Sequence, residues 1–355
     1  MSNPTNKIRV LIVDDSAIIR SLLTRFLSSD PEIEVVGTAP DPFVAREKLV
    51  ALKPDVMTLD IEMPRMDGVT FLEKVMQHFP IRTLMISSLS ARGTETALRA
   101  LEAGAIDVMG KPAIDVTKSM ESLATEIVMR VKNVARARLK APSSNTNSAA
   151  RAPVVKPKSG ALAKSTHQIL AIAASTGGTV ALKEVLSRLP ADIPGTVIVQ
   201  HMPPGFTSTF AKGLNDACAF EVKEAEEGDA IIPGRALLAP GNFHMEIIRS
   251  GGYYSVKLHQ EPLLHGVRPA ADYLMKSVAH FAGSNAIGVI LTGMGKDGAE
   301  GLLAMKNAGA YTIGQNEQTC VVYGMPKVAF EIGAVQRVLP LEQIAFELTN
   351  RFQKD

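Results

Sequence analysis

Cysteine, tryptophan and long apolar runs are scarce in this sequence. Among its 355 residues there are two cysteines, Cys218 and Cys320, and no tryptophan. With no Cys-x-x-Cys spacing, the cysteines support neither a disulfide framework nor a thiolate zinc site. No stretch reaches the ~18 apolar residues that a membrane span needs, and the first ten residues lack a signal-peptide pattern. These absences predict a protein of the reducing cytoplasm that does not insert into a membrane.

A large excess of charge of one sign is also missing. The 38 basic and 36 acidic residues leave a formal net charge of +2, which gives no electrostatic attraction to nucleic acid or anionic lipid. The sequence also has no basic recognition helix, so we expect no nucleic-acid partner. The length is enough for two domains, and the 46% share of hydrophobic residues is ordinary for a globular protein.

The first part of the chain, residues 1–139, alternates short apolar runs with helical patterns. The predicted strands are 7–13, 33–39, 55–60, 83–88 and 105–110, and the predicted helices are 17–27, 42–52, 69–78, 94–103 and about 117–139. Five strand-helix pairs predict an α/β domain with a doubly wound parallel sheet, which binds ligands at the carboxyl ends of its strands.

Five polar residues stand at those strand ends. Asp14 and Asp15 end the first strand, Asp60 the third, Ser87 the fourth and Lys111 the fifth. Three clustered carboxylates predict a hard divalent cation, most plausibly Mg²⁺, and the set is what an aspartyl-phosphate site requires, with Asp60 attacking phosphorus. Taken alone, the Asp14 and Asp15 pair is more often a helix N-cap, and Lys111 a loop lysine.

The motifs VDDS, LDIEMPRMDG, ISS and GKP resemble the response-regulator receiver domain over residues 7 to 130. The resemblance implies that Asp15 and Asp60 bind the metal with Asp14 as a supporting acid, and that Asp60 is the phosphoacceptor. It also implies that Ser87 and Lys111 form the switch pair. Val108 stands where many receivers carry an aromatic residue.

Residues 140–166 are rich in Ala, Ser, Pro and Lys and have no periodicity. Such a segment buries too little apolar surface to offset the entropy of ordering it, so it predicts a flexible linker. The second domain is then 167–355.

A buried strand opens the second domain. Ile169 to Ala174 is apolar throughout, and it runs into Ser175-Thr176-Gly177-Gly178 and a helical pattern from 179 to 188. Ser175 therefore lies at a strand-to-helix turn, where free N–H groups and a partial positive charge suit a negative oxygen. A serine so placed is a candidate nucleophile, although an isolated Ser-x-Gly-Gly is more often a helix N-cap.

The rest of this domain repeats the alternation. A strand ends before His201, a mixed region of short strands covers 220–259, and a helix starts near Pro269. A strand then leads to the Gly-rich loop 293–298, which opens another helix, and 311–315 with one final helix closes the chain. A second, Rossmann-like parallel sheet is predicted.

Ser175, His201 and Asp297 each lie at or just past a strand end, so we expect them along one crevice. These are the residue types of a nucleophile, its general base and the acid that orients the base. Separately, His201 is more often a structural histidine and Asp297 a helix cap. The other candidates for the general base are His244, His259, His265 and His280. We expect His280 on or near the packed face of a helix. The spacing of these histidines gives little support for zinc.

The motifs AASTGG, QHMPPGFT and LTGMGKDG resemble the catalytic domain of the chemotaxis-specific protein-glutamate methylesterases. Gly-x-Ser-x-Gly, the α/β-hydrolase motif, is not matched. The resemblance implies that Ser175 is the nucleophile, His201 the base and Asp297 the orienting acid. It further implies that the backbone N–H of Met294 helps to bind the oxyanion, with Thr176 as a supporting residue. Arg268 keeps the family's Arg-Pro pair, although the residues around it differ.

The resemblance implies a phosphorylation-regulated enzyme that hydrolyses glutamate γ-methyl esters, and deamidates specific glutamines, on methyl-accepting chemoreceptors. Mg²⁺ is expected for receiver phosphorylation by the chemotaxis histidine kinase, and no cofactor for the ester hydrolysis. We also expect the unphosphorylated receiver to pack over the catalytic crevice. The alternatives are a receiver with a non-catalytic, receptor-binding output domain and a serine peptidase.

Overall fold

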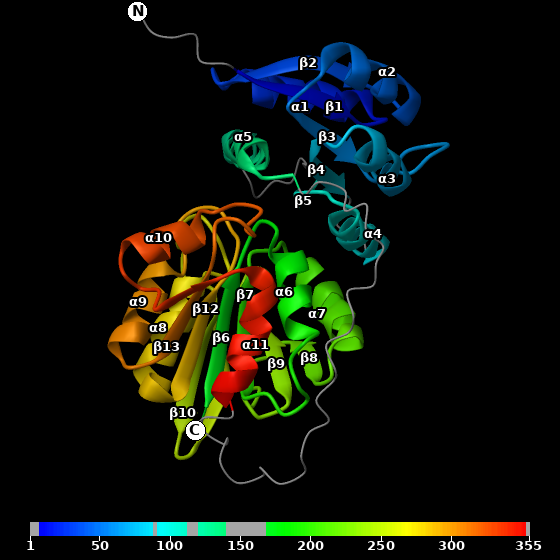
Figure 1. The fold of residues 1–355 in the computed structure, drawn as a ribbon. Coiled ribbons are helices and arrows are strands. Elements are labelled where there is room, and N and C mark those ends of the chain that lie inside the picture. Colours follow the sequence, from blue (N-terminus) through cyan, green and yellow to red (C-terminus); the bar gives the residue numbers. More distant parts are fainter. Residues whose placement is uncertain (1–6, 88–90, 112–119, 140–167, 353–355) are drawn as a thin grey trace, which may run out of the picture. The chain divides into compact units, whose positions relative to one another are not determined.

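The computed structural model describes residues 7–87, 91–111, 120–139 and 168–352 (Figure 1). The chain divides into two compact units, Met1–Thr146 and Asn147–Asp355. The predicted linker, 140–166, lies outside the described residues.

The first unit contains a five-stranded parallel sheet with the strand order β2-β1-β3-β4-β5. Its strands are β1 (Ile8–Val13), β2 (Ile33–Ala39), β3 (Val56–Asp60), β4 (Arg82–Ser87) and β5 (Asp107–Gly110), and its helices are α1 (Ala17–Ser28), α2 (Pro42–Leu52), α3 (Gly68–His78), α4 (Ala91–Glu102) and α5 (Met120–Arg136). Strand β2 lies on one side of β1, and β3, β4 and β5 follow on the other side. The loops after β1 and β3 therefore lead to opposite faces of the sheet and leave a crevice at the carboxyl ends of these two strands. The predicted doubly wound sheet is confirmed.

Side-chain caps explain where the first three helices of this unit begin. Ser16, Asp41 and Asp67 each accept a hydrogen bond from a backbone N–H in the first turn that follows. Such caps satisfy N–H groups that have no partner inside the helix. Helix α4 begins at Ala91, three residues before the prediction, because Gly93 and Thr94 are weak helix formers that obscure its first turn. The predicted start of the last helix, near 117, lies outside the described residues.

The second unit contains a seven-stranded sheet with the order β14-β13-β12-β6-β7-β9-β8, and every strand pairing in it is parallel. Its strands are β6 (Ile169–Ala174), β7 (Gly195–Gln200), β8 (Glu221–Glu224), β9 (Arg235–Leu238), β12 (Ala286–Ile290), β13 (Tyr311–Gln315) and β14 (Arg337–Leu339). Strand β6 lies between β7 and β12 and all six of its residues are buried, as its uninterrupted apolar sequence predicts.

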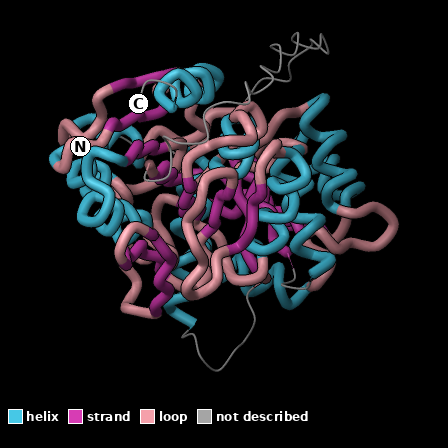
Figure 2. The backbone as a smooth tube through the Cα atoms, turned by 90° about the horizontal axis from the view of Figure 1, so that it is seen from below, coloured by secondary structure: helices cyan, strands magenta, loops and turns pink. Residues whose placement is uncertain are grey.

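Helices cover both faces of this sheet. The first group is α6 (Gly178–Leu186), α7 (Phe206–Ala217) and α11 (Leu341–Phe352), and the second is α8 (Ala271–Ala282), α9 (Ala299–Asn307) and α10 (Met325–Glu331). Figure 1 shows the first group on one face and the second on the other. A short 3₁₀ helix, Gly283–Asn285, follows α8. Figure 2 shows the same elements along the backbone tube, with strands in magenta and helices in cyan.

One feature of the second unit adds to the prediction, and another contradicts it. The mixed region contributes a separate antiparallel hairpin of β10 (His244–Ser250) and β11 (Tyr253–His259), which packs on α8. The prediction of one final helix is wrong, because α10, β14 and α11 follow β13. Strand β14 has three residues, too few to show an alternating pattern, and it therefore hid the boundary between the two helices.

Among the described residues, the structure contains no helix with both the length and the apolar character that crossing a bilayer requires.

Candidate active site

Ser175 lies in the turn between β6 and α6. Its N–H donates to the carbonyl of Thr292, 3.0 Å away, and its own carbonyl accepts from Gly178 N–H at 2.7 Å. Gly177 takes a left-handed φ of 78°, and a Cβ at this position would lie 2.6 Å from the Cβ of Val321. The turn that carries the half-buried serine therefore requires the glycine for its backbone angle and for space.

His201 follows β7 and is a cross-strand neighbour of Ser175. The register of β6 and β7 pairs Ala174 with Gln200, and the next residue on each strand is the serine or the histidine. The backbone N–H of His201 donates to the carbonyl of Ala174, 3.2 Å away. Since paired strands lie about 4.8 Å apart, the two side chains leave the sheet side by side.

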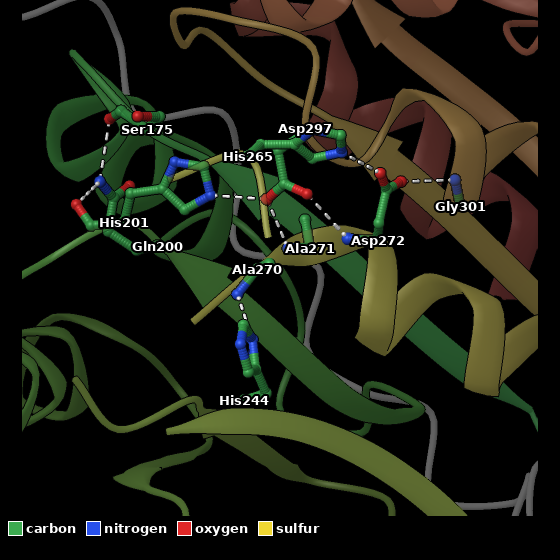
Figure 3. A network of polar contacts seen from close by, with 10 residues as sticks. All are labelled: Ser175, Gln200, His201, His244, His265, Ala270, Ala271, Asp272, Asp297 and Gly301. Atoms are coloured by element: carbon green, nitrogen blue, oxygen red, sulfur yellow. Dashed lines mark hydrogen bonds and ion pairs between the residues drawn. The ribbon is translucent and has the colours of Figure 1, made fainter. Parts of the chain in front are cut away.

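The imidazole of His201 contacts the carboxylate of Asp297. Nε2 lies 2.8 Å from Oδ2 of Asp297, and the histidine side chain is 11% exposed. Figure 3 shows the opposite edge of the ring, which carries Nδ1, directed to the side where Ser175 lies. With Nε2 donating to a carboxylate, Nδ1 is the nitrogen able to accept a proton from the serine.

Asp297 lies in the loop between β12 and α9, and its side chain is almost completely buried. Its Oδ2 accepts from the backbone N–H of Ala271 at 2.6 Å, and Oδ1 accepts from that of Asp272 at 3.1 Å. Burial by itself raises the pKa of Asp297. The interaction with His201, together with the two N–H groups, outweighs burial and holds the pKa of Asp297 below its ordinary value. The carboxylate is therefore charged at neutral pH.

The loop after β12 also passes close beside the serine. A Cβ on Gly293 would lie 2.7 Å from the Cβ of Ser175, so only glycine fits there. The carbonyl of Gly293 accepts from the N–H groups of Gly324 and Met325, at 3.1 and 2.8 Å, which anchors the loop. Met294 is half-buried, and among the described residues its N–H has no hydrogen-bond acceptor. An N–H with no acceptor beside the serine is suited to bind an oxyanion.

The first unit holds a second cluster of charged groups. Asp14 and Asp60 are buried, Asp15 is exposed, and one oxygen from each lies within 4.8 Å of the others. Nζ of Lys111 lies 2.8 Å from Oδ2 of Asp60 and 3.8 Å from Oδ2 of Asp14. Ser87 is buried at the end of β4, and its hydroxyl donates to the carbonyl of Gly93.

This cluster fits a divalent cation. Oδ2 of Asp14 is buried and, among the described residues, has no hydrogen-bond partner. Three carboxylates face Lys111 and the nearby Arg20, so negative charge is in excess by one, and oxygen donors with this charge are the ligands that Mg²⁺ prefers.

Burial shapes the titration of this cluster. It raises the pKa of Asp60 to about 6, against the opposing hydrogen bond from Lys111. Burial also raises the pKa of Asp14. For Lys111, burial acts to lower the pKa, but the hydrogen bond and charge of Asp60 outweigh burial and raise it.

Replacement of Asp60 by asparagine is expected to stabilise the first unit above pH 6. In the unfolded chain the aspartate ionises near pH 3.9, whereas in the fold its pKa is about 6. The folded state therefore binds the proton more tightly than the unfolded chain does. Ionisation of Asp60 lowers the free energy of unfolding increasingly between the unfolded and the folded pKa, and by a constant amount at higher pH. The shift corresponds to on the order of 2 to 3 kcal/mol at neutral pH.

Urea unfolding of the full chain in EDTA, at pH 4.5 and pH 7.5, measures this effect. Asp60→Asn should raise the midpoint of the first unit's transition at pH 7.5 and change it much less at pH 4.5. The exposed Glu73→Gln on α3 is the control. An equal gain at both pH values would contradict an electrostatic origin.

Two family models match the chain. Residues 170–348 match the model described as CheB methylesterase, and residues 10–122 match the response regulator receiver domain. The chain belongs to the CheB methylesterase family.

Relatives of this CheB methylesterase cover nearly its whole length. A Bdellovibrio bacteriovorus protein named protein-glutamate methylesterase/protein-glutamine glutaminase is 66% identical over 350 residues, which is 98% of each chain. A Pseudomonas aeruginosa protein of the same name, numbered 2, is 54% identical over 341 residues, or 96% of each chain. The crystal structure of the Thermotoga maritima CheB methylesterase catalytic domain is 40% identical, with a TM-score of 0.52, and the match covers 52% of this chain and 99% of that one.

The other histidines of this CheB methylesterase have different surroundings. His244 is buried with both ring nitrogens bonded: Nδ1 accepts from Ala270 N–H at 3.1 Å, and Nε2 donates to the carbonyl of Pro262 at 3.2 Å. Burial lowers the pKa of His244. The ring of His259 packs against those of His244 and Tyr273. His280 is exposed on α8, so the expectation that it lies on the packed face is wrong.

Residues flanking the predicted site hold its backbone in place. The hydroxyl of Thr292 donates to the carbonyl of Thr176, which is buried, and so joins the serine turn to the end of β12. Arg268 donates to Oδ1 of Asn242 at 2.8 Å and to the carbonyls of Gln260 and Glu261, which ties two loops of the second unit together.

Sequence reasoning missed Gln200 and Asp272. The side-chain amide of Gln200 donates to the carbonyls of Ser175 and His201, at 2.9 and 3.2 Å. Its position directly before the histidine was the available signal. For Asp272 the available signal was an acidic residue in the first turn of a helix.

Proposed function

We propose that this chain is a phosphorylation-regulated protein-glutamate methylesterase and protein-glutamine glutaminase. Its substrates would be γ-glutamyl methyl esters and particular glutamines on the cytoplasmic helices of methyl-accepting chemoreceptors, giving receptor demethylation in chemotactic adaptation. The observation that carries the proposal is the 2.8 Å contact between His201 and Asp297 beside the turn that carries Ser175. The names of the full-length relatives support the substrate class.

Ser175, His201 and Asp297 divide the first half of the reaction between them. Ser175 Oγ attacks the γ-carbonyl carbon while Nδ1 of His201 takes its proton. The charged Asp297 stabilises the imidazolium that forms. The negative oxygen of the tetrahedral intermediate accepts a hydrogen bond from the N–H of Met294. When the intermediate collapses, His201 gives the proton to the methoxy oxygen, which leaves as methanol, or to the amide nitrogen of a glutamine, which leaves as ammonia.

The second half repeats these steps with water. Water attacks the glutamyl ester on Ser175, and His201 takes a proton from the water and returns it to Ser175 Oγ. The products are a glutamate side chain and the free enzyme. Thr176 supports this cycle through its carbonyl, whose bond to Thr292 keeps the serine turn joined to the strand that leads to Met294.

In the receiver unit, Asp60 would take a phosphoryl group from the chemotaxis histidine kinase. Asp14, Asp15 and Asp60 would hold Mg²⁺, which neutralises phosphoryl oxygens during transfer. Lys111, already 2.8 Å from the acceptor carboxylate, would bind the phosphoryl group afterwards, and Ser87 would follow it as the switch hydroxyl.

Methanol release from methyl-labelled receptor membranes tests the proposed reaction. The esterase should release methanol, and it should release it faster when a phosphodonor such as acetyl phosphate is present with Mg²⁺. A non-catalytic output domain would bind the membranes and release none. A serine peptidase would cleave a peptide panel and leave the esters intact.

A chain that begins at Lys164 is expected to release methanol faster than the full chain without phosphate. The fragment contains all of residues 170–348, and the solved Thermotoga domain of the same extent supports its independent folding. Removal of an inhibitory receiver and phosphorylation of Asp60 should both raise the rate. Initial rates at equal enzyme concentration give the comparison.

Full-length Asp60→Asn is the matched control, because it cannot accept phosphate on this carboxylate. It should match the unphosphorylated chain and show no response to acetyl phosphate. Equal rates for the fragment and the unphosphorylated full chain would count against inhibition by the receiver, and leave the esterase assignment intact.

A further inference from the structure

Helix α8 begins without a capping side chain of its own. Its N-cap residue is Ala270, which has no side-chain acceptor. The first N–H groups of a helix have no partner inside it and need one from elsewhere. Here Ala270 N–H donates to His244, and those of Ala271 and Asp272 donate to the two oxygens of Asp297 (Figure 3). Backbone N–H groups at the start of α8 therefore hold Asp297, the orienting acid of the hydrolytic site.

Helix α9 is capped in the same way, by an aspartate from α8. Its N-cap is Gly298, also without a side-chain cap, and the N–H of Gly301 in its first turn donates to Oδ1 of Asp272 at 2.7 Å. Asp297 precedes α9 and caps α8, while Asp272 lies in α8 and caps α9. The start of α8 thus binds the carboxylate that precedes α9, and the start of α9 binds a carboxylate from α8.

His265 occupies the remaining oxygen of Asp272. Its Nε2 lies 2.9 Å from Oδ2, the aspartate is completely buried, and the histidine side chain is 20% exposed. The ring therefore stands between a buried carboxylate and solvent. The backbone of His265 takes a φ of 54°, a left-handed angle that costs a non-glycine residue free energy.

The packing of the two helix starts leaves little room for adjustment. A Cβ on Gly301 would lie 2.6 Å from the Cβ of Met275, and a Cβ on Gly298 would lie 3.1 Å from that of Ala271. The helices approach this closely because both positions are glycine. The N–H groups that hold Asp297 therefore belong to a closely packed junction of the two helices.

A metal ion is a weaker interpretation of these residues. One ligand atom each from His265, Asp272 and Asp297 lie within 4.8 Å of one another. All four carboxylate oxygens, however, already accept a hydrogen bond from a backbone N–H or an imidazole. A metal would have to break those bonds.

We propose that Asp272 and His265 are positioning residues for the hydrolytic reaction. Asp272 locks α8 against α9, His265 holds Asp272 in place, and the aligned N–H groups fix the carboxylate that orients His201. Neither residue touches the substrate or the reacting atoms. The inference rests on the proposed function, because it concerns the same triad.

Kinetics of substituted full-length enzymes, phosphorylated and assayed for methanol release, test this inference. Asp272→Ala should lower kcat by about 10- to 100-fold, as loss of supporting residues does elsewhere, with KM changed less than about threefold. Asp272→Asn should recover most of the rate, because its oxygen still accepts from Gly301 N–H. His265→Ala should lower kcat by about fivefold, and His265→Gln by less, since an amide can still donate to Asp272. Two exposed residues supply controls expected to match the native rate: His280→Gln on α8 and Glu300→Gln on α9.

A double substitution separates positioning from a general loss of structure. If Asp272 acts through Asp297, Asp272→Ala should lower kcat little further in an Asp297→Ala background. An equal fold-loss in both backgrounds, or a native kcat for Asp272→Ala alone, would overturn the inference. If Asp272→Ala fails to fold, Asp272→Asn and the two His265 variants decide, because unchanged kcat in all three also overturns it. Failure of the proposed function itself would be seen separately, as native activity in Ser175→Ala.

Discussion

Ser175→Ala is expected to lower the kcat for methanol release by about 10⁴- to 10⁶-fold, the loss typical of a removed serine nucleophile. The alanine has no oxygen to form the glutamyl ester, so only oxyanion binding and substrate positioning remain. KM should change little, because the substituted atom makes its interaction in the transition state. Labelled receptor membranes and long incubations allow the residual rate to be measured.

Ser187→Ala is the matched control for this substitution. Ser187 is an exposed serine at the end of α6, the helix that follows Ser175, and its removal should leave the rate unchanged. The double variant Ser175→Ala/His201→Ala should be no slower than the more impaired single variant, because nucleophile and base act as one unit. Near-native activity of Ser175→Ala would refute the catalytic assignment, and multiplied losses in the double variant would refute the pairing with His201.

Asp297→Asn is expected to lower kcat by about 10³- to 10⁴-fold while substrate binding is retained. The asparagine can keep one oxygen on the N–H groups of α8 and turn its amide toward Nε2 of His201. That nitrogen then becomes an acceptor, the ring proton moves to Nδ1, and the base can no longer accept a proton from Ser175. The substitution also removes the negative charge that stabilises the imidazolium.

Steady-state kcat and KM, with a thermal unfolding scan of the same samples, measure the effect of Asp297→Asn. Asp216→Asn on α7 is the control, since this aspartate is exposed and lies near the end of a helix that carries no member of the triad. Activity of Asp297→Asn within tenfold of native, in a protein that unfolds at a similar temperature, would contradict an orienting role for the carboxylate.

Local patterns were enough to predict most of the fold. Strand β6 was predictable because its residues are apolar without interruption, and α2 was predicted with the observed bounds because Pro42 follows a capping aspartate. The patterns failed where an element was short or its contacts were distant. Strand β14 has three residues, and the exposure of His280 depends on how α8 lies on its neighbours.

The candidate site was predictable for the residues at strand ends, because parallel strands present their carboxyl ends at one edge. Gln200 and Asp272 were missed since their roles come from bonds to backbone groups of other segments, and such bonds leave no periodic trace in the sequence. The structure adds the surroundings of the rival histidines: both ring nitrogens of His244 are already bonded, and His265 is paired with Asp272.

By itself, the sequence determined that this protein has two parallel α/β sheets, a serine in a strand-to-helix turn and a cluster of acids at the strand ends of the first sheet. Apolar periodicity and turn residues belong to contiguous segments, so they can be recognised without the fold. Only the tertiary structure decided that β12, β6 and β7 are adjacent, and that His201 meets a carboxylate 96 residues away. Strand order and helix packing arise from contacts between distant segments, and those contacts set the hydrogen bonds of the site.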